Sequence, residues 1–250
     1  MKLHTLVFLA LVSSSVTFAA GAETNEVSVL ISSNDVSEPF GFGGQSKGVI
    51  ADTYKAIFKD TGVNTLIVPM PDQRIKNHII KGTYKNWLSW GGMSWFRNSK
   101  NIYYSKQHLF VSNDIIVFNA KPTANKITTN ALNDLRLGKI SGFYYRWINQ
   151  NTITNIATVE SAFSALHRDR IDCFLFAYPR IEYYFAKYPN IARGLKYDYI
   201  TNLNEEKIFL IFDQKLPLKI KSLIDTQLVK LISDGTIASI FNKYHLPYTQ

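Results

Sequence analysis

The sequence predicts an α/β protein with two open, mostly parallel sheets that are joined by two hinge strands. Strand and helix patterns alternate along the chain, and the alternation starts afresh in its second half. Successive strands are separated by segments long enough for a helix, which implies parallel pairing through a right-handed crossover. No Pro/Gly-rich linker divides the chain, so we expect the two sheets to form two lobes of one α/β unit.

The first two dozen residues are expected to be an export signal that is not part of the fold. Lys2 gives a basic start, residues 5–12 form a short apolar run, and residues 20–22 form an Ala-Gly-Ala cleavage signal. Cleavage after Ala22 would leave 228 of the 250 residues. The alternative is an uncleaved membrane anchor, but the apolar run is short for a bilayer and no later segment is long enough. The mature chain is therefore expected to be soluble and exported.

Composition argues against several classes of function. The net charge is +9, or +8 without Lys2, but the basic residues are scattered, so no nucleic-acid partner is expected. The only cysteine, Cys173, lies in an apolar run and is expected to be a buried side chain. None of the five histidines lies three or four residues from another, and no nucleophile motif occurs. No metal, cofactor or catalytic residue is predicted.

In the first half, strands are expected at residues 27–32, 65–69 and 86–92. Between them, apolar residues recur at helical spacing in 48–62 and 72–82, and each range closes on a glycine that would stop the helix. The second of these helices begins at an aspartate, which we expect to be its N-cap.

The alternation resumes after a strand at 114–119 and ends in two helices. Further strands are expected at 137–141, 171–178 and 207–212. The helices of this half are expected at 144–151, at 158–170 with Thr158 as N-cap, from Pro179 as first residue, around Ile220–Leu231 as far as Gly235, and from Thr236 as N-cap.

The segment WLSWGGMSWFR is the strongest candidate for a binding site. Strand alternation places Ser89 and Trp90 on opposite faces. Gly91 and Gly92 then end a parallel strand at its carboxyl end, where open α/β sheets bind ligands, and they would let a ligand approach the backbone. Arg97 follows and can donate two hydrogen bonds to a carboxylate. The alternative is that the tryptophans are core and the arginine pairs with a surface acid, and the pattern alone leaves both open.

Six segments of the chain carry motifs in a characteristic order. They are EPFGF (38–42), KGVIADTYKAIFKDTGV (47–63), FRNSKNIYYS (96–105), TTNALNDLRLGKISG (128–142), SAFSALHRDRID (161–172) and VKLISDGTIASIFNKYHLP (229–247). Together they resemble the periplasmic solute-binding proteins of family 3, the type best known for polar amino acids. The resemblance spans nearly all of the chain after the signal. It implies two lobes that close on a ligand in the cleft between them.

The resemblance also implies a division of the chain and a set of site residues. Lobe 1 would comprise residues 23–116 and 210–250, and lobe 2 residues 117–209. Arg97 would grip the ligand's carboxylate. The expected ligand-binding residues are Phe40, Arg74, Ser89, Trp90, Gly91, Gly92, Arg97, Tyr144, Tyr145 and Tyr178.

Departures from the family pattern favour a ligand other than an ordinary amino acid. Amino-acid-binding members place an acid five residues beyond the aspartate that Asp172 matches, and this chain has Ala177 there. Trp90 and Gly92 replace small hydroxyl residues. The ligand's ammonium group would lose its partner, while an arginine and aromatic rings remain, which suits an anionic ligand.

The resemblance therefore implies a periplasmic monomer that captures a small, carboxylate-bearing solute for an ABC-type permease, without catalysis of its own. One alternative is a periplasmic enzyme on the same scaffold, of the prephenate-type dehydratase kind, for which Glu38 is the candidate general acid. Another is a ligand sensor that docks on a membrane receptor. The sequence does not separate a transporter from a sensor.

Overall fold

The computed structural model describes most of the chain after residue 25. The described residues are 26–96, 99–119, 129–130, 132, 134–141, 143, 145, 147–148, 153–200, 203 and 205–250. The expected export signal and its cleavage position lie outside these ranges. Within them, no helix has the length and apolar character needed to cross a membrane.

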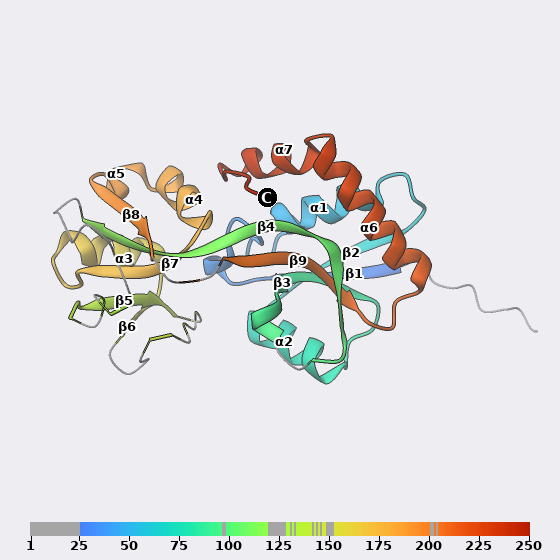
Figure 1. Cartoon of the computed structure of the whole chain (residues 1–250), viewed down its shortest axis with the longest axis horizontal. Coiled ribbons are helices and arrows are strands. Elements are labelled where there is room, and N and C mark those ends of the chain that lie inside the picture. Colours follow the sequence, from blue (N-terminus) through green and yellow to red (C-terminus); the bar gives the residue numbers. More distant parts are fainter. Residues whose placement is uncertain are drawn as a thin grey trace, which may run out of the picture.

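One long strand, β4 (Ile102–Asn119), runs through both halves of the molecule (Figure 1). The strand order is β2-β1-β3-β9-β4-β7-β5-β6, and β8 also pairs with β4. As far as Ser112, β4 pairs with β9, and from Asn113 onward it pairs with β7. Below, lobe 1 means β1, β2, β3, β9 and the helices packed on them, and lobe 2 means β5 to β8 and their helices.

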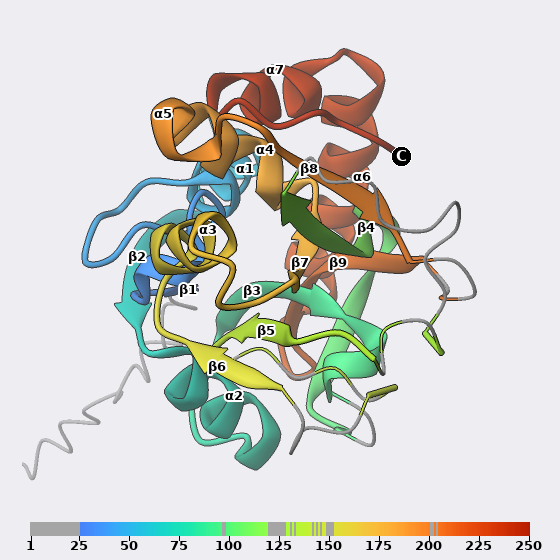
Figure 2. The ribbon, with the colours of Figure 1, turned by 90° about the vertical axis from the view of Figure 1, so that its left-hand side faces the viewer.

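Lobe 1 contains three parallel strands, followed in the sheet by the antiparallel β9. Helices α1, α6 and α7 cover one face of this sheet and α2 lies on the other (Figure 2). The strands are β1 (Glu26–Ser32), β2 (Asn64–Met70), β3 (Trp87–Gly92) and β9 (Glu206–Asp213). The helices are α1 (Val49–Phe58), α2 (Asp72–Lys81), α6 (Leu218–Ser233) and α7 (Thr236–Lys243), with 3-10 turns at Asp35–Ser37 and Met93–Phe96.

Lobe 2 has parallel strands β6, β5 and β7, and both β7 and β8 run antiparallel to β4. Its strands are β5 (Leu137–Ile140), β6 (Thr154–Ile156), β7 (Cys173–Tyr178) and β8 (Leu195–Tyr199). Its helices are α3 (Val159–His167), α4 (Arg180–Lys187) and α5 (Pro189–Ala192). The predicted α/β class is confirmed, with parallel strands in each lobe. The two sets are joined through β4 into one nine-stranded sheet, and the pairings that β4 and β9 make are antiparallel.

Each sheet buries apolar side chains on both faces. In β3, Trp87 packs on the α2 side, whereas Leu88 packs on the side of α1 and α6. In β4, Ile115 and Val117 face the core that includes α3 and α4, whereas Ile116 faces the opposite core. Successive side chains of a strand point to opposite faces, so both faces of these strands are apolar. The predicted alternation along the tryptophan-rich strand is confirmed.

The helices begin close to the predicted positions, and three of the predictions are wrong by one residue. Thr158 caps α3 as predicted, because its Oγ1 accepts the Ser161 N–H at 3.1 Å. Asp72 and Thr236, predicted as N-caps, are instead the first residues of their helices, because the preceding Pro71 is extended and the preceding Gly235 is left-handed. Pro179, predicted as a first residue, precedes the first residue of α4.

Some elements were not predicted. The strand expected at 114–119 is only the last part of β4, and β6, β8 and α5 were missed. These three elements are short, and β8 is largely exposed on both faces, so they lack a clear apolar period. The helix expected at 144–151 falls mostly on residues outside the described ranges, and Tyr145, Trp147 and Ile148 are not helical.

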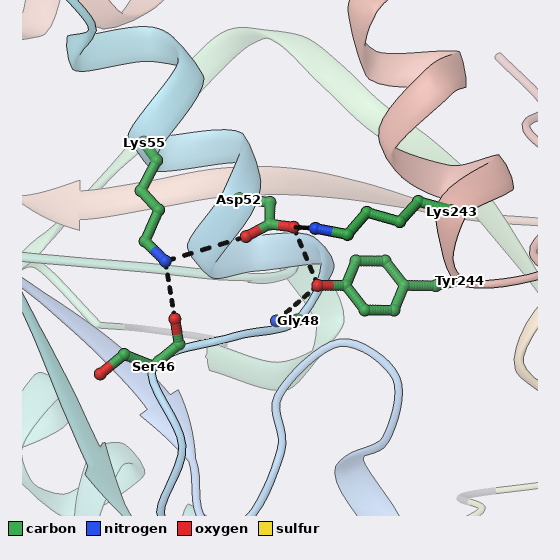
Figure 3. Close-up of polar contacts among 6 residues, drawn as sticks. All are labelled: Ser46, Gly48, Asp52, Lys55, Lys243 and Tyr244. Atoms are coloured by element: carbon green, nitrogen blue, oxygen red, sulfur yellow. Dashed lines mark hydrogen bonds and ion pairs between the residues drawn. The ribbon is translucent and has the colours of Figure 1, made fainter.

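Polar contacts join the first helix of lobe 1 to the end of α7 (Figure 3). The Asp52 carboxylate accepts hydrogen bonds from Lys243 Nζ at 2.6 Å and from the Tyr244 hydroxyl at 2.8 Å. The same hydroxyl accepts the buried Gly48 N–H at 3.0 Å. Lys55 Nζ lies 3.9 Å from the Asp52 carboxylate and donates to the Ser46 carbonyl at 2.7 Å. Two motif segments far apart in the sequence therefore meet, and Asp52 is committed to this structural role.

Replacing Tyr244 with Phe is expected to lower the free energy of unfolding by about 1–3 kcal/mol, because the buried Gly48 N–H loses its acceptor. The matched control is Tyr248→Phe. The Tyr248 hydroxyl is buried without a hydrogen-bond partner among the described residues, so its removal is expected to be neutral or stabilising. Urea unfolding of both variants measures the difference, and equal effects would contradict the role of the Tyr244 hydroxyl.

Candidate functional site

The candidate site lies where the two lobes face each other beside β4. Lobe 1 contributes the segment after β1 and the carboxyl end of β3, and lobe 2 contributes the start of α4 and the segment after β5. Arg97 and Tyr144, two of the expected ligand-binding residues, lie outside the described residues, so their placement stays a prediction.

The end of β3 packs aromatic rings against one another. The Trp90 ring stacks on Phe40 with centroids 4.8 Å apart and meets Trp95 edge-on at 5.4 Å. Phe40 also stacks on Phe110 of β4 at 5.0 Å. Ser89 is buried, and its hydroxyl donates to the Leu30 carbonyl at 3.0 Å, so it serves the sheet. The structure thus stacks Phe40 on Trp90 but turns Ser89 inward.

The two glycines are surrounded by side chains of the chain itself. A Cβ on Gly91 would lie 2.7 Å from the Phe96 ring and 3.2 Å from the Trp95 ring. A Cβ on Gly92 would overlap the carboxylate of Glu206, the first residue of β9. The Glu206 Oε1 atom also accepts the Ser94 N–H at 3.1 Å. Both glycines are therefore required for packing within the chain.

A buried arginine that the sequence analysis did not select lies between the lobes. The Arg180 guanidinium is 5.2 Å from the Phe40 ring of lobe 1 and 5.3 Å from the Phe143 ring of lobe 2. Burial lowers the pKa of Arg180, while Tyr184 and Asp72 act in the opposite direction. Arg180 directly follows Tyr178-Pro179 at the carboxyl end of β7, and this position could have identified it.

An acid that the sequence analysis did not consider is Asp114. It pairs with Ala177 across β4 and β7, and its carboxylate accepts the Trp147 Nε1–H at 3.0 Å. Burial raises the pKa of Asp114, and the nearby Glu206 carboxylate raises it further, although the hydrogen bond from Trp147 opposes this. A carboxyl group, that of Asp114, therefore lies on the strand next to Ala177, the position at which amino-acid-binding members were expected to have an acid.

The remaining expected residues are dispersed. Tyr145 is buried in a core of lobe 2, where its ring meets Trp147 edge-on at 5.9 Å. Arg74 is exposed in the first turn of α2. Tyr178 meets the Tyr199 ring edge-on at 5.5 Å, and both line a cavity of about 500 Å³ beside β4.

Neither a metal site nor a reactive thiol is seen in the described part of the chain. Its histidine, cysteine and acidic side chains nowhere gather in threes that could hold a metal ion. Cys173 is buried, as predicted, and burial raises the pKa of its thiol to about 12.

Direct contacts link the segment after β1 to α4. The Glu38 carboxylate accepts the Tyr183 hydroxyl at 2.9 Å and forms an ion pair with Lys187. The Tyr184 hydroxyl donates to the Asp35 carbonyl at 3.1 Å. These hydrogen bonds, made to lobe 1 by α4 of lobe 2, are called the interlobe latch below. They hold the lobes against each other.

No family model and no curated protein matches the chain in sequence. Solved structures do match it in fold. The GluR0 ligand-binding core in complex with L-glutamate is 15% identical, with a TM-score of 0.70 over 90% of this chain and 99% of that one. An ancestral cationic amino-acid solute-binding protein is 18% identical, with a TM-score of 0.68 over 88% and 96%. A substrate-binding protein of an ABC uptake transporter from Streptococcus pneumoniae, with bound histidine, is 19% identical, with a TM-score of 0.65 over 88% and 92%. The chain therefore has the two-lobed fold of these ligand-binding proteins.

Glu38→Gln is expected to weaken the interlobe latch by about 1 kcal/mol, because the ion pair with Lys187 becomes a neutral contact. Small-angle scattering without added ligand should then give a larger radius of gyration than the wild type. Glu182→Gln is the matched control, since Glu182 lies on the same helix but accepts the Tyr197 hydroxyl within lobe 2. A Glu38→Gln radius equal to that of the wild type would contradict the latch.

Proposed function

We propose that the chain captures a small, carboxylate-bearing solute between its two lobes and delivers it to an ABC-type permease in the periplasm. The observation that carries this proposal is Arg180, a buried cation enclosed by Phe40 of lobe 1 and Phe143 of lobe 2. A cation at such a place favours an anionic guest, because a low-dielectric environment strengthens the attraction. The fold supports a binding role, since each of the three similar structures is described as a ligand-binding, solute-binding or substrate-binding protein.

Lobe closure is the proposed means of capture. We propose lobe 1 as residues 23–116 and 210–250 and lobe 2 as residues 117–209, in a chain that works as a monomer after cleavage behind Ala22. The change of β4 partner between Ser112 and Asn113 supports a hinge within a few residues of these boundaries. Two chain crossings between lobes permit a hinge motion.

The two alternative functions, an enzyme and a ligand sensor, are not equally supported by the structure. The dehydratase-like enzyme needs a general acid, and its candidate Glu38 is engaged by Lys187 and Tyr183 in the interlobe latch. That engagement argues against the enzyme, and we propose no catalysis. A sensor that docks on a membrane receptor would use the same closure as a transporter protein. Co-purification with a permease, rather than with a membrane receptor, would support the transporter role.

Arg97→Ala is expected to reduce affinity for a carboxylate solute several-fold to several-hundred-fold, about 1.5–3 kcal/mol, through loss of a charge-assisted contact. Arg97→Lys should also bind poorly, because an ammonium cannot replace the two parallel hydrogen bonds. Dicarboxylates, aromatic acids, sugars and amino acids are first screened by thermal shift, where a ligand at 100 times its Kd stabilises by about 2.7 kcal/mol. Scattering with the ligand found should show a smaller radius of gyration. Equal affinity of wild type and Arg97→Ala would contradict the role of Arg97.

Ordinary α-amino acids are expected to bind more weakly than carboxylates without an amino group, with Kd above about 1 mM. The reason is Ala177, which offers no partner to an ammonium group that would be buried on closure. Calorimetry with the twenty amino acids checks this. Micromolar binding of any one would contradict the expected ligand class, and a loss of that binding in Asp114→Asn would identify Asp114 as the ammonium partner.

A further inference from the structure

The carboxylate of Glu206 lies directly on the backbone at the carboxyl end of β3. It comes so close to the Gly92 Cα that no side chain fits there, and its Oε1 accepts the Ser94 N–H at 3.1 Å. A carboxylate that accepts a backbone N–H forms a charge-assisted hydrogen bond, which is stronger than a neutral one. The end of β3 is thus a place that binds a carboxylate, and here the carboxylate belongs to the chain.

This is the place at which the strand pattern predicts a ligand. Gly91 and Gly92 end a parallel strand where open α/β sheets bind ligands. The Trp95 and Phe96 rings lie against Gly91, and the Glu206 carboxylate lies against Gly92. The side chain that fills the space is that of Glu206 in β9, which is far from Gly92 in the sequence. A solute's carboxylate and that of Glu206 cannot occupy the same space, and their like charges repel.

We propose that Glu206 is an internal competitor for the carboxylate of the solute and thereby sets the specificity of the site, a proposal that rests on the proposed function. An anionic solute replaces one carboxylate with another, so the Ser94 N–H keeps an acceptor throughout. A neutral solute offers no carboxylate for the exchange and leaves Glu206 in place. Glu206 therefore raises the Kd of every carboxylate, and only an acid that makes further contacts in the site displaces it.

The exchange also acts at the hinge. Glu206 is the first residue of β9 and pairs with Ser112, the last residue of β4 before the strand changes partner. Glu206 is also close enough to Asp114, at the start of the lobe 2 pairing, to raise the pKa of that carboxyl group. Release of the Glu206 carboxylate therefore removes a contact between β3 and the start of the hinge strand β9.

The test uses acetate as the smallest carboxylate and follows the backbone amide signals of Gly92 and Ser94 by NMR. Glu206→Ala vacates the position, so acetate is expected to shift these signals saturably, with a Kd at least tenfold lower than in the wild type. Glu205→Ala is the matched control, because Glu205 is the neighbouring residue, carries the same charge and has an exposed side chain. It should behave as the wild type, and sodium chloride at equal ionic strength should produce no saturable shift.

Several results would overturn the proposal. An acetate Kd within threefold of the wild-type value in Glu206→Ala, or no saturable shift in that variant, would mean that Glu206 only supports the local backbone. If Glu206→Ala does not fold, Glu206→Gln keeps the side-chain volume without the charge and should bind acetate at least threefold more tightly than the wild type. Unchanged binding there would equally overturn it. Absence of any solute from the wild-type screen would count against the proposed function alone, since the acetate comparison does not depend on it.

Discussion

The structure depends on one constraint, which is that β4 is a single strand with its two ends in different cores. Its first part pairs with β9 and its last part with β7 and β8. A continuous strand cannot let the lobes separate, but it can bend where the partner changes at Ser112 and Asn113. The carboxyl ends of the parallel strands β3, β5 and β7 therefore lie near this bend, and side chains that follow them, such as Phe143 and Arg180, meet groups of the other lobe.

Charged groups of the chain lie where the two lobes meet. Arg180 is buried and Asp114 is half-buried, and burial of a charge without compensation costs several kcal/mol. Compensation comes from contacts that the chain makes with itself, including the rings beside Arg180 and the Trp147 N–H on Asp114. A solute that enters must replace such contacts, so the preferred ligand class depends on which of these groups it can satisfy.

The sequence predicted elements with a strong apolar period and clear ends. The strands around Val29, Leu88 and Leu175 were found because both faces are buried, and α2 was found because Gly82, at φ +63°, ends it. The pairing of Arg180 with Phe40 and of Glu206 with Gly92 could not be predicted, because these partners are far apart in the sequence and no local period connects them. The position of Arg180 after a parallel strand was a signal in the sequence that could have identified it as a site residue. No sequence signal indicated that the Ser89 hydroxyl bonds to the Leu30 carbonyl within the sheet.

The interlobe latch acts on the closure of the lobes, whereas the carboxylate of Glu206 acts on the entry of a ligand. The latch makes hydrogen bonds and an ion pair that exist only while the lobes are together, so it favours the closed arrangement whether or not a solute is bound. The carboxylate of Glu206 occupies space at the end of β3 and opposes an anionic guest in either arrangement. A solute shifts the balance between open and closed only by the difference in its affinity for the two. Because the latch favours closure without a solute, affinity for a solute depends on what that solute must displace, and the carboxylate of Glu206 is one such group.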